Sequence, residues 1–258
     1  MKSNSNSGKD IYKDFASSYR IGKYDRYSAR MAELMPDILG YFSLNPVNIL
    51  DLACGEGTFA IKLAELGYQV TGVDLSEEML KMARESAKKE GREVKFLRED
   101  MREISFSKEY DLVTCWFDSM NYLLSEEDWK RVFKNVRNSL TEDGVFIFDM
   151  NTLYGLSVEW QNPSCYVAQD KKDIFEVHRK SFDEEHNSAV LNITGFLKEN
   201  DGWTKFQEKH QEVSYPLEKI EKMFSGIGFE KLACWNNPEV KSEPDEESGR
   251  VWYVLEKV

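Results

Sequence analysis

The most constraining feature of this chain is a glycine-rich turn between an apolar run and a helix-length segment. Residues 48–52 read NILDL, and glycines follow at positions 55 and 57. A second apolar run, residues 68–74, ends in Asp74. The succession of strand, turn, helix and strand predicts a βαβ unit, and units of this kind build the parallel sheets of α/β proteins.

A βαβ unit with glycines at its first turn and a carboxylate at the end of its second strand is suited to hold a nucleoside. Gly55 and Gly57 would let the backbone approach the ligand, and Asp74 would accept hydrogen bonds from two ribose hydroxyls. The same spacing occurs in dinucleotide-binding proteins, and glycines can also serve helix–strand packing alone. By itself, the turn leaves all three interpretations open.

Two further carboxylates favour a nucleoside that carries an amino acid. Asp51 precedes the glycines, where it would disfavour a pyrophosphate at the helix N-terminus and could pair with a cationic, phosphate-free ligand. Asp100 closes a third apolar run, residues 94–100, and is followed by Met101. This pair could face an adenine amino group and cover one face of the ring.

Together these motifs resemble the class I S-adenosylmethionine-dependent methyltransferases. The matching segments are DLACGEGT at 51–58, GVDLS at 72–76, EDM at 99–101, and the fourth and fifth strands at 110–115 and 140–149. The resemblance implies an α/β fold, a Rossmann-like seven-stranded sheet with a terminal β-hairpin, and S-adenosyl-L-methionine as cofactor. The cofactor-binding residues that it implies are Tyr12, Tyr19, Tyr27, Asp51, Ala53, Gly55, Gly57, Asp74, Leu75, Asp100, Met101 and Cys115.

The three tyrosines in this set belong to an N-terminal segment that is expected to be helical. Apolar residues recur on one face of the stretch from Ile11 to Tyr19, and again within residues 27–39. Packing of an amphipathic helix pair on the sheet would explain the pattern. In the small-molecule methyltransferases that the chain resembles, such tyrosines close over the methionine part of the cofactor. An aspartate common after the second tyrosine is Arg20 here.

The loop after the fourth strand holds the candidate acceptor-binding residues. Residues 116–124 combine Asp118, Ser119, Asn121 and Tyr122 with aromatic side chains at the carboxyl end of a central strand, where open α/β sheets bind ligands. Simple capping of the turn would also explain Asp118 or Asn121. In the amino-sugar N-methyltransferases that the chain resembles, a histidine takes the place of Tyr122.

Tyr122 and Asp118 are the predicted catalytic residues. A tyrosine with an ordinary pKa of about 10 is a poor base at neutral pH. We therefore expect Tyr122 to orient an acceptor amine as a hydrogen-bond partner. Asp118 is expected to hold the ammonium form or to relay its proton through water.

An antiparallel β insertion is predicted between the fifth strand and the following helix. Segments 173–182, 188–197 and 203–213 alternate apolar and polar residues, with turn signals between them. Such a layer would cover the pocket or pair with a second copy of the chain in a homodimer. The expected organisation is a helical lid at 1–40, a Rossmann-like cofactor-binding domain at 41–152 and 213–258, and the β insertion at 153–212. Strands at 230–235 and 250–255 form the expected terminal hairpin.

Composition narrows the partners and the location. The net charge of −12 disfavours a nucleic-acid substrate, because phosphate backbones are bound by an excess of Lys and Arg. No apolar run approaches the ~20 residues of a membrane span, and Met1 to Gly8 lack the apolar stretch of a signal peptide. The four cysteines and the strand histidines His178 and His210 show no metal-ligand spacing. The expectation is a cytoplasmic enzyme without a metal or a membrane partner.

The function that these observations favour is methyl transfer from S-adenosylmethionine to a small-molecule acceptor, an amine in our interpretation. Displacement at a sulfonium methyl needs mainly alignment and desolvation of the nucleophile. One alternative is an NAD-dependent oxidoreductase that uses the same glycine turn, against which Asp51 and the terminal hairpin argue. A second alternative is a non-catalytic S-adenosylmethionine-binding protein.

Overall fold

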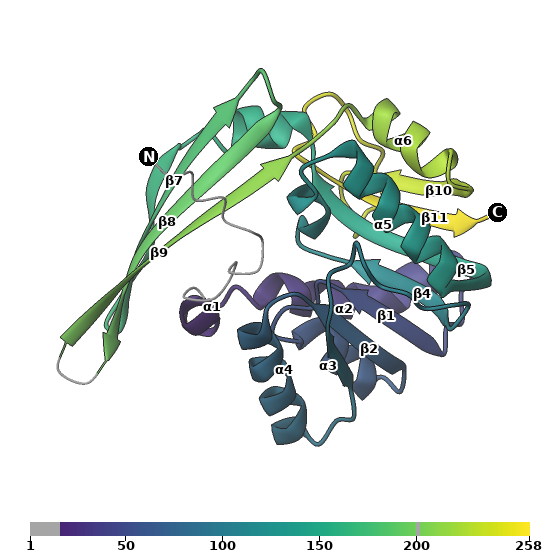
Figure 1. Cartoon of the computed structure of the whole chain (residues 1–258), viewed down its shortest axis with the longest axis horizontal. Helices are drawn as coiled ribbons and strands as arrows, with labels where there is room; N and C mark the ends of the chain where they lie inside the picture. The colour runs from purple at the N-terminus through teal and green to yellow at the C-terminus, as the bar shows by residue number, and fades with distance from the viewer. Residues whose placement is uncertain (1–15, 200–201) are drawn as a thin grey trace.

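The computed structural model describes residues 16–199 and 202–258, which form a seven-stranded sheet flanked by helices and a second, smaller sheet (Figure 1). The first half of the chain contains α1 (Ala16–Gly22), α2 (Arg26–Tyr41), β1 (Asn48–Leu52), α3 (Thr58–Glu65), β2 (Gln69–Asp74), α4 (Glu77–Glu90), β3 (Lys95–Arg98), β4 (Tyr110–Cys115), the short helix η2 (Ser119–Tyr122) and α5 (Glu126–Ser139). The second half contains β5 (Leu140–Asn151), the π-helical turn η3 (Gly155–Glu159), β6 (Cys165–Lys171), β7 (Ile174–Asp183), β8 (Ser188–Glu199), β9 (Gly202–Val213), α6 (Leu217–Ser225), β10 (Phe229–Trp235) and β11 (Arg250–Lys257).

The large sheet has the strand order β10-β11-β5-β4-β1-β2-β3. Strands β1 to β5 run parallel, whereas β11 is antiparallel to both β5 and β10. The predicted seven-stranded sheet and its terminal hairpin are therefore confirmed. The parallel strands all end at one edge of the sheet, so the residues that follow them converge there.

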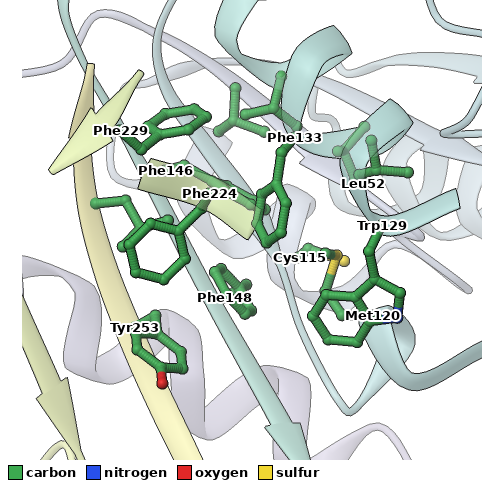
Figure 2. Close-up of a cluster of buried hydrophobic side chains, with 14 of the residues drawn as sticks. Leu52, Cys115, Met120, Trp129, Phe133, Phe146, Phe148, Phe224, Phe229 and Tyr253 are labelled. Atoms are coloured by element: carbon green, nitrogen blue, oxygen red, sulfur yellow. The ribbon is translucent and has the colours of Figure 1, made fainter. Parts of the chain in front are cut away.

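Helices cover both faces of the large sheet. Figure 2 shows one face, where Phe133 of α5 and Phe224 of α6 meet Phe148 of the sheet, with ring centroids 5.9 Å apart between Phe133 and each of the other two. On the other face, α2, α3 and α4 bury their apolar sides, including Met35 and Leu80. Fully burying each such side chain contributes about 1.5–3 kcal/mol, so the sheet is a rigid base for the residues at its edge.

The second sheet projects away from the first (Figure 1) and has four antiparallel strands in the order β6-β7-β8-β9. The sequence predicts three of these strands and misses β6. Strand β6 lies at the edge of the sheet and is only partly buried, so its residues do not alternate clearly between apolar and polar.

Helix α1 and the turn after it are attached to the second sheet. Gln169 Nε2 donates to the carbonyl of Gly22 and Lys171 Nζ to that of Ile21, both at 3.1 Å. Tyr19 joins a small apolar cluster with Met79 of α4 and residues of β7, β8 and β9. The N-terminal segment thus connects the two sheets beside the carboxyl edge of β1 and β2. No helix among the described residues has both the length and the apolar character needed to cross a membrane.

Candidate active site

A cavity of about 740 Å³ opens at the carboxyl edge of the parallel strands. Its wall combines residues that follow β1, β2, β3 and β4 with others from α1, α4, η2 and β9. Nine of the predicted site residues line it: Tyr19, Asp51, Ala53, Gly55, Asp74, Leu75, Asp100, Met101 and Tyr122. A more open hollow at the opposite edge, beside Gln69 and Lys95, contains none of them. The structure therefore brings most of the predicted site together.

The turn after β1 is shaped by residues with left-handed backbone conformations. Ala53 and Gly55 have φ of 54° and 56°. The N–H of Gly55 donates to Asp74 Oδ2 and the N–H of Ser76 donates to Asp74 Oδ1, both at 2.8 Å. Burial raises the pKa of Asp74, while hydrogen bonds from the backbone of Ser76, Gly55 and Leu75 oppose that shift. Asp74 is thereby fixed against the turn, with its carboxylate at the cavity wall.

Gly57 occupies a different environment from Gly55. Its φ is +84°, and a Cβ on it would lie 2.8 Å from the Cβ of Ala83 and 3.0 Å from the ring of Phe96. It does not line the cavity. The structure thus gives Gly57 a role in packing α3 against α4 and β3, whereas Gly55 faces the ligand space.

Asp51 lines the cavity and has one buried carboxylate oxygen without a partner among the described residues. Its side chain is 1 % exposed, and Oδ1 accepts a hydrogen bond from Thr114 Oγ1 at 3.0 Å. Oδ2 is buried and has no hydrogen-bond partner in the described part of the chain. Burial raises the pKa of Asp51 to about 8, and the nearby charges of Asp74 and Glu56 add to the effect. A cationic ligand group would satisfy this oxygen and favour the ionised form.

Asp100 lies two residues beyond the end of β3 and is paired with Arg102. Arg102 Nη2 lies 2.6 Å from Asp100 Oδ2, and its Nε donates to both carboxylate oxygens. Partial burial raises the pKa of Asp100, but the hydrogen bonds and charge of Arg102 outweigh it and the net shift is downward. Asp100 is therefore held ionised beside Met101, which also lines the cavity.

Comparison with known proteins identifies the chain. The family model described as "Methyltransferase domain" matches residues 49–144. A Bacillus subtilis protein provisionally named methyltransferase YqeM is 31% identical over 252 residues, which are 96% of this chain and 97% of YqeM. This chain belongs to the S-adenosylmethionine-dependent methyltransferases.

Two other similar proteins agree with this assignment. The crystal structure of an S-adenosylmethionine-dependent methyltransferase from Clostridium acetobutylicum superposes with a TM-score of 0.83 at 27% identity, covering 95% of this chain and 98% of the other. A dTDP-3-amino-3,6-dideoxy-alpha-D-glucopyranose N,N-dimethyltransferase from Streptomyces fradiae is 25% identical over 216 residues, 81% of this chain and 79% of that protein.

S-adenosylmethionine is the cofactor of this methyltransferase, and the cavity fits it. The molecule carries a nucleoside, an ammonium group and a sulfonium centre. The orphaned Asp51 oxygen suits the ammonium group, and Asp74 lies at a strand end suited to a ribose. One ligand therefore suits both acids, because its ammonium group can pair with Asp51 and its ribose hydroxyls can donate to Asp74.

Four predicted site residues are described by the structure but do not line the methyltransferase cavity. Tyr27 lies behind Phe117, with the two rings stacked at 4.9 Å between centroids, and Phe117 is part of the wall. Cys115 is fully buried at the end of β4. The others are Gly57, described above, and Asp118. Tyr12 lies outside the described residues.

Asp118 belongs to a buried polar network beneath the loop after β4. Arg250 Nη2 lies 3.1 Å from Asp118 Oδ1, and Asn151 Nδ2 donates to Oδ2 at 2.9 Å. The backbone N–H groups of Phe117 and Asp118, both at positive φ, donate to the Asp149 carboxylate at 2.6 and 3.2 Å. The side chain of Asp118 therefore holds the loop in place behind the wall.

The site also contains residues that the sequence interpretation missed. Lys209 and Gln211 of β9 line the cavity, and His210 between them lies 2.9 Å from the hydroxyl of Tyr122. The only sequence signal for His210 is a repeated Glu-x-His pattern, at 176–178 and 208–210. Nothing local to β9 indicates that its histidine meets Tyr122, which is 88 residues away.

Proposed function

We propose that this methyltransferase acts on an amine of a small, positively charged molecule. The observation that supports this proposal is the charge of the cavity wall. Six acids line it, against the two cations Arg102 and Lys209, and Arg102 is already paired with Asp100. The six acids are Asp51, Glu56, Asp74, Glu99, Asp100 and Asp128. A wall with this excess of carboxyl groups favours a cationic acceptor.

In this proposal the cofactor is held mainly by residues that follow the parallel strands. Asp74 accepts both ribose hydroxyls, and Gly55 allows close approach of the backbone. Asp100 and Met101 frame the adenine, beside Leu75, while Asp51 pairs with the ammonium group. Ala53 shapes the turn, and Tyr19 covers the methionine part.

Gly57, Cys115 and Tyr27 support this surface from behind. Tyr27 does so through Phe117, and Gly57 through α4. We likewise assign Asp118 a supporting role in the loop, because its oxygens are engaged by Arg250 and Asn151. Tyr122 is then the predicted catalytic residue that reaches the cavity.

The main task of the protein in this reaction is to align the acceptor with the methyl group. S-adenosylmethionine supplies an electrophilic methyl group when it is bound. The protein holds the acceptor nitrogen in line with that group, excludes water and orients the lone pair, with Tyr122 as the hydrogen-bond partner of the amine. Orientation of this kind supplies much of the rate enhancement in bimolecular reactions.

The relative from Streptomyces fradiae supports the amine, because its name specifies methylation of nitrogen on an amino sugar. The four-stranded sheet, which contributes Lys209 and Gln211 to the wall, is assigned to acceptor binding. The division into lid, cofactor-binding domain and β insertion, the homodimer, the absence of nucleic-acid and membrane partners, and the cytoplasmic location stay predictions.

The proposal is tested with methyl-labelled S-adenosylmethionine and a panel of small amines, each paired with the corresponding alcohol or carboxylic acid. Mass spectrometry of the products identifies the methylated atom. Labelled amines, with the alcohols and acids unchanged, are expected. Methylation confined to oxygen or carbon would contradict the proposal, and tighter binding of NADH than of S-adenosylhomocysteine would contradict the cofactor assignment.

A further inference from the structure

The contact between Tyr122 and His210 has a consequence for proton transfer. The Tyr122 hydroxyl lies 2.9 Å from His210 Nδ1, and the two rings meet edge to face with centroids 5.9 Å apart. Tyr122 lines the cavity, whereas His210 is only 3 % exposed. The tyrosine hydroxyl therefore separates a buried imidazole from the space available to the acceptor.

A carboxylate lies near the second ring nitrogen of His210, the one that does not contact Tyr122. Glu208 Oε2 lies 3.2 Å from His210 Nε2. Both residues belong to β9 and are two positions apart, so their side chains project from the same face of the strand. Tyr122, His210 and Glu208 thus form a line that begins at the cavity and ends at Glu208 on β9, the edge strand of the second sheet.

We propose that this line removes the proton from the acceptor amine, with His210 taking the proton by way of Tyr122. The inference rests on the methyl transfer to an amine proposed above. Alkyl amines, like the lysine side chain with a pKa of about 10.4, are protonated at neutral pH and have no free lone pair. Tyrosine alone is a weak base, whereas imidazoles change protonation state near neutral pH as a class.

An N–H proton of the ammonium group moves to the Tyr122 oxygen as the Tyr122 hydroxyl proton moves to His210 Nδ1. The freed nitrogen lone pair forms the new N–C bond to the methyl carbon, and the C–S bond breaks with its electron pair left on sulfur. The products are a methylated ammonium ion, a thioether and one proton on His210, which is later lost to water. Glu208 stabilises the imidazolium while it exists. His210 is a positioning residue, because it acts through Tyr122.

The same sheet contains a matched set of residues that can serve as a control. Tyr166 Oη lies 3.2 Å from His178 Nδ1, and His178 Nε2 lies 2.5 Å from Glu176 Oε1. Like His210, His178 is buried. None of these three side chains is among the residues that line the cavity in the described chain. Contact with a tyrosine that lines the cavity, rather than the Glu-x-His pattern itself, distinguishes His210.

The kinetic test compares His210→Asn with His178→Asn in the full-length protein, using an amine that the wild type methylates. An asparagine amide can replace one hydrogen bond of the ring but cannot take up a proton. For His210→Asn we expect kcat to fall roughly ten- to a hundredfold, with acceptor KM and S-adenosylhomocysteine affinity within about threefold. His178→Asn should keep kcat within about twofold. Equal losses in both variants, or none for His210→Asn, would overturn the relay.

A second measurement does not depend on turnover. The chain has three histidines, so ¹⁵N-histidine labelling gives three sets of ring signals that His178→Asn and His210→Asn assign. The relay requires the neutral ring of His210 to carry its proton on Nε2, leaving Nδ1 to accept from Tyr122, and Tyr122→Phe should shift the Nδ1 signal. A proton found on Nδ1 would overturn the relay. Absence of any amine product from the wild type would overturn the proposed function and the relay together, whereas normal product from His210→Asn would overturn the relay alone.

Discussion

The Asp74 carboxylate accepts a hydrogen bond from the backbone N–H of Gly55 at 2.8 Å, which ties the tip of β2 to the turn after β1. Oδ2 therefore positions the turn, Oδ1 accepts from the N–H of Ser76, and Asp74 as a whole lines the cavity. The glycine turn after β1 and the acidic end of β2 are thus joined by a hydrogen bond, so a substitution of Asp74 affects both motifs.

Asp74→Ala should weaken the binding of S-adenosylhomocysteine by one to two orders of magnitude. Losing a charged acceptor of buried hydroxyls costs on the order of 1.5–3 kcal/mol. Asp111→Ala is the matched control, since Asp111 Oδ2 also accepts two backbone N–H groups, those of Val47 and Asn48, both at 2.9 Å, at the opposite edge of the sheet. Calorimetric titration should show near wild-type affinity for the control. Similar losses in both variants would mean that loop stability, not ribose binding, explains the effect.

Cofactor binding should release a proton from Asp51. With a pKa of about 8 in the free protein, this carboxyl is roughly nine-tenths protonated at pH 7. An ammonium group placed against it favours the ionised form, so the proton leaves. Calorimetry in two buffers of different ionisation enthalpy should show release approaching one proton at pH 7 and little above pH 9. Asp51→Asn should lack this contribution, and an unchanged release in that variant would exclude the contact.

The same group predicts a pH-dependent stability for the unliganded protein. The pKa of Asp51 is raised from 3.8 to about 8 on folding. The unfolded chain therefore binds fewer protons than the folded one between these values, and stability falls as the pH rises from about 4 to 8. Asp51→Asn removes this dependence. Thermal unfolding should place the variant several degrees higher relative to wild type at pH 8.5 than at pH 5, and a constant difference would contradict the assignment.

Gly57 and Gly67 give a matched pair for the packing argument. Both have positive φ, +84° and +97°, but a Cβ on Gly57 would lie 2.8 Å from the Cβ of Ala83, whereas Gly67 has nothing within 4 Å. Gly67→Ala should cost about 1–2 kcal/mol of unfolding free energy for the backbone alone. Gly57→Ala should cost a further 1–3 kcal/mol, approximately, for the overlap. Urea denaturation measures both, and equal costs would refute the packing role of Gly57.

The large sheet could be predicted from the sequence because its signals are local. Strands β1 and β4 are short, buried apolar runs, and the turn after β1 has glycine at two of its positive-φ positions, 55 and 57. Asp51 and Asp74 follow from the same logic, since the residues at the ends of parallel strands converge at one edge.

The remaining parts of the site depend on contacts between distant segments. Arg250 reaches Asp118 across 132 residues, and His210 reaches Tyr122 across 88. The sequence alone predicts that Asp118 is an acid in a ligand-binding loop, because nothing near it in sequence indicates that β11 supplies a guanidinium partner. Strand β6 was missed for a related reason, since only its pairing with β7 defines it.

Lys209 provides the test of whether the second sheet contributes to acceptor choice. It lines the cavity from β9, next to the histidine that contacts Tyr122, whereas Lys205 on the same strand, exposed like Lys209, is not part of the wall. Lys209→Ala should change the acceptor KM by roughly three- to tenfold, or about 0.7–1.4 kcal/mol, and leave S-adenosylhomocysteine affinity within about twofold. Lys205→Ala should change neither. Steady-state kinetics and calorimetry decide the matter: a loss of cofactor affinity with an unchanged acceptor KM would place Lys209 on the cofactor side of the cavity instead.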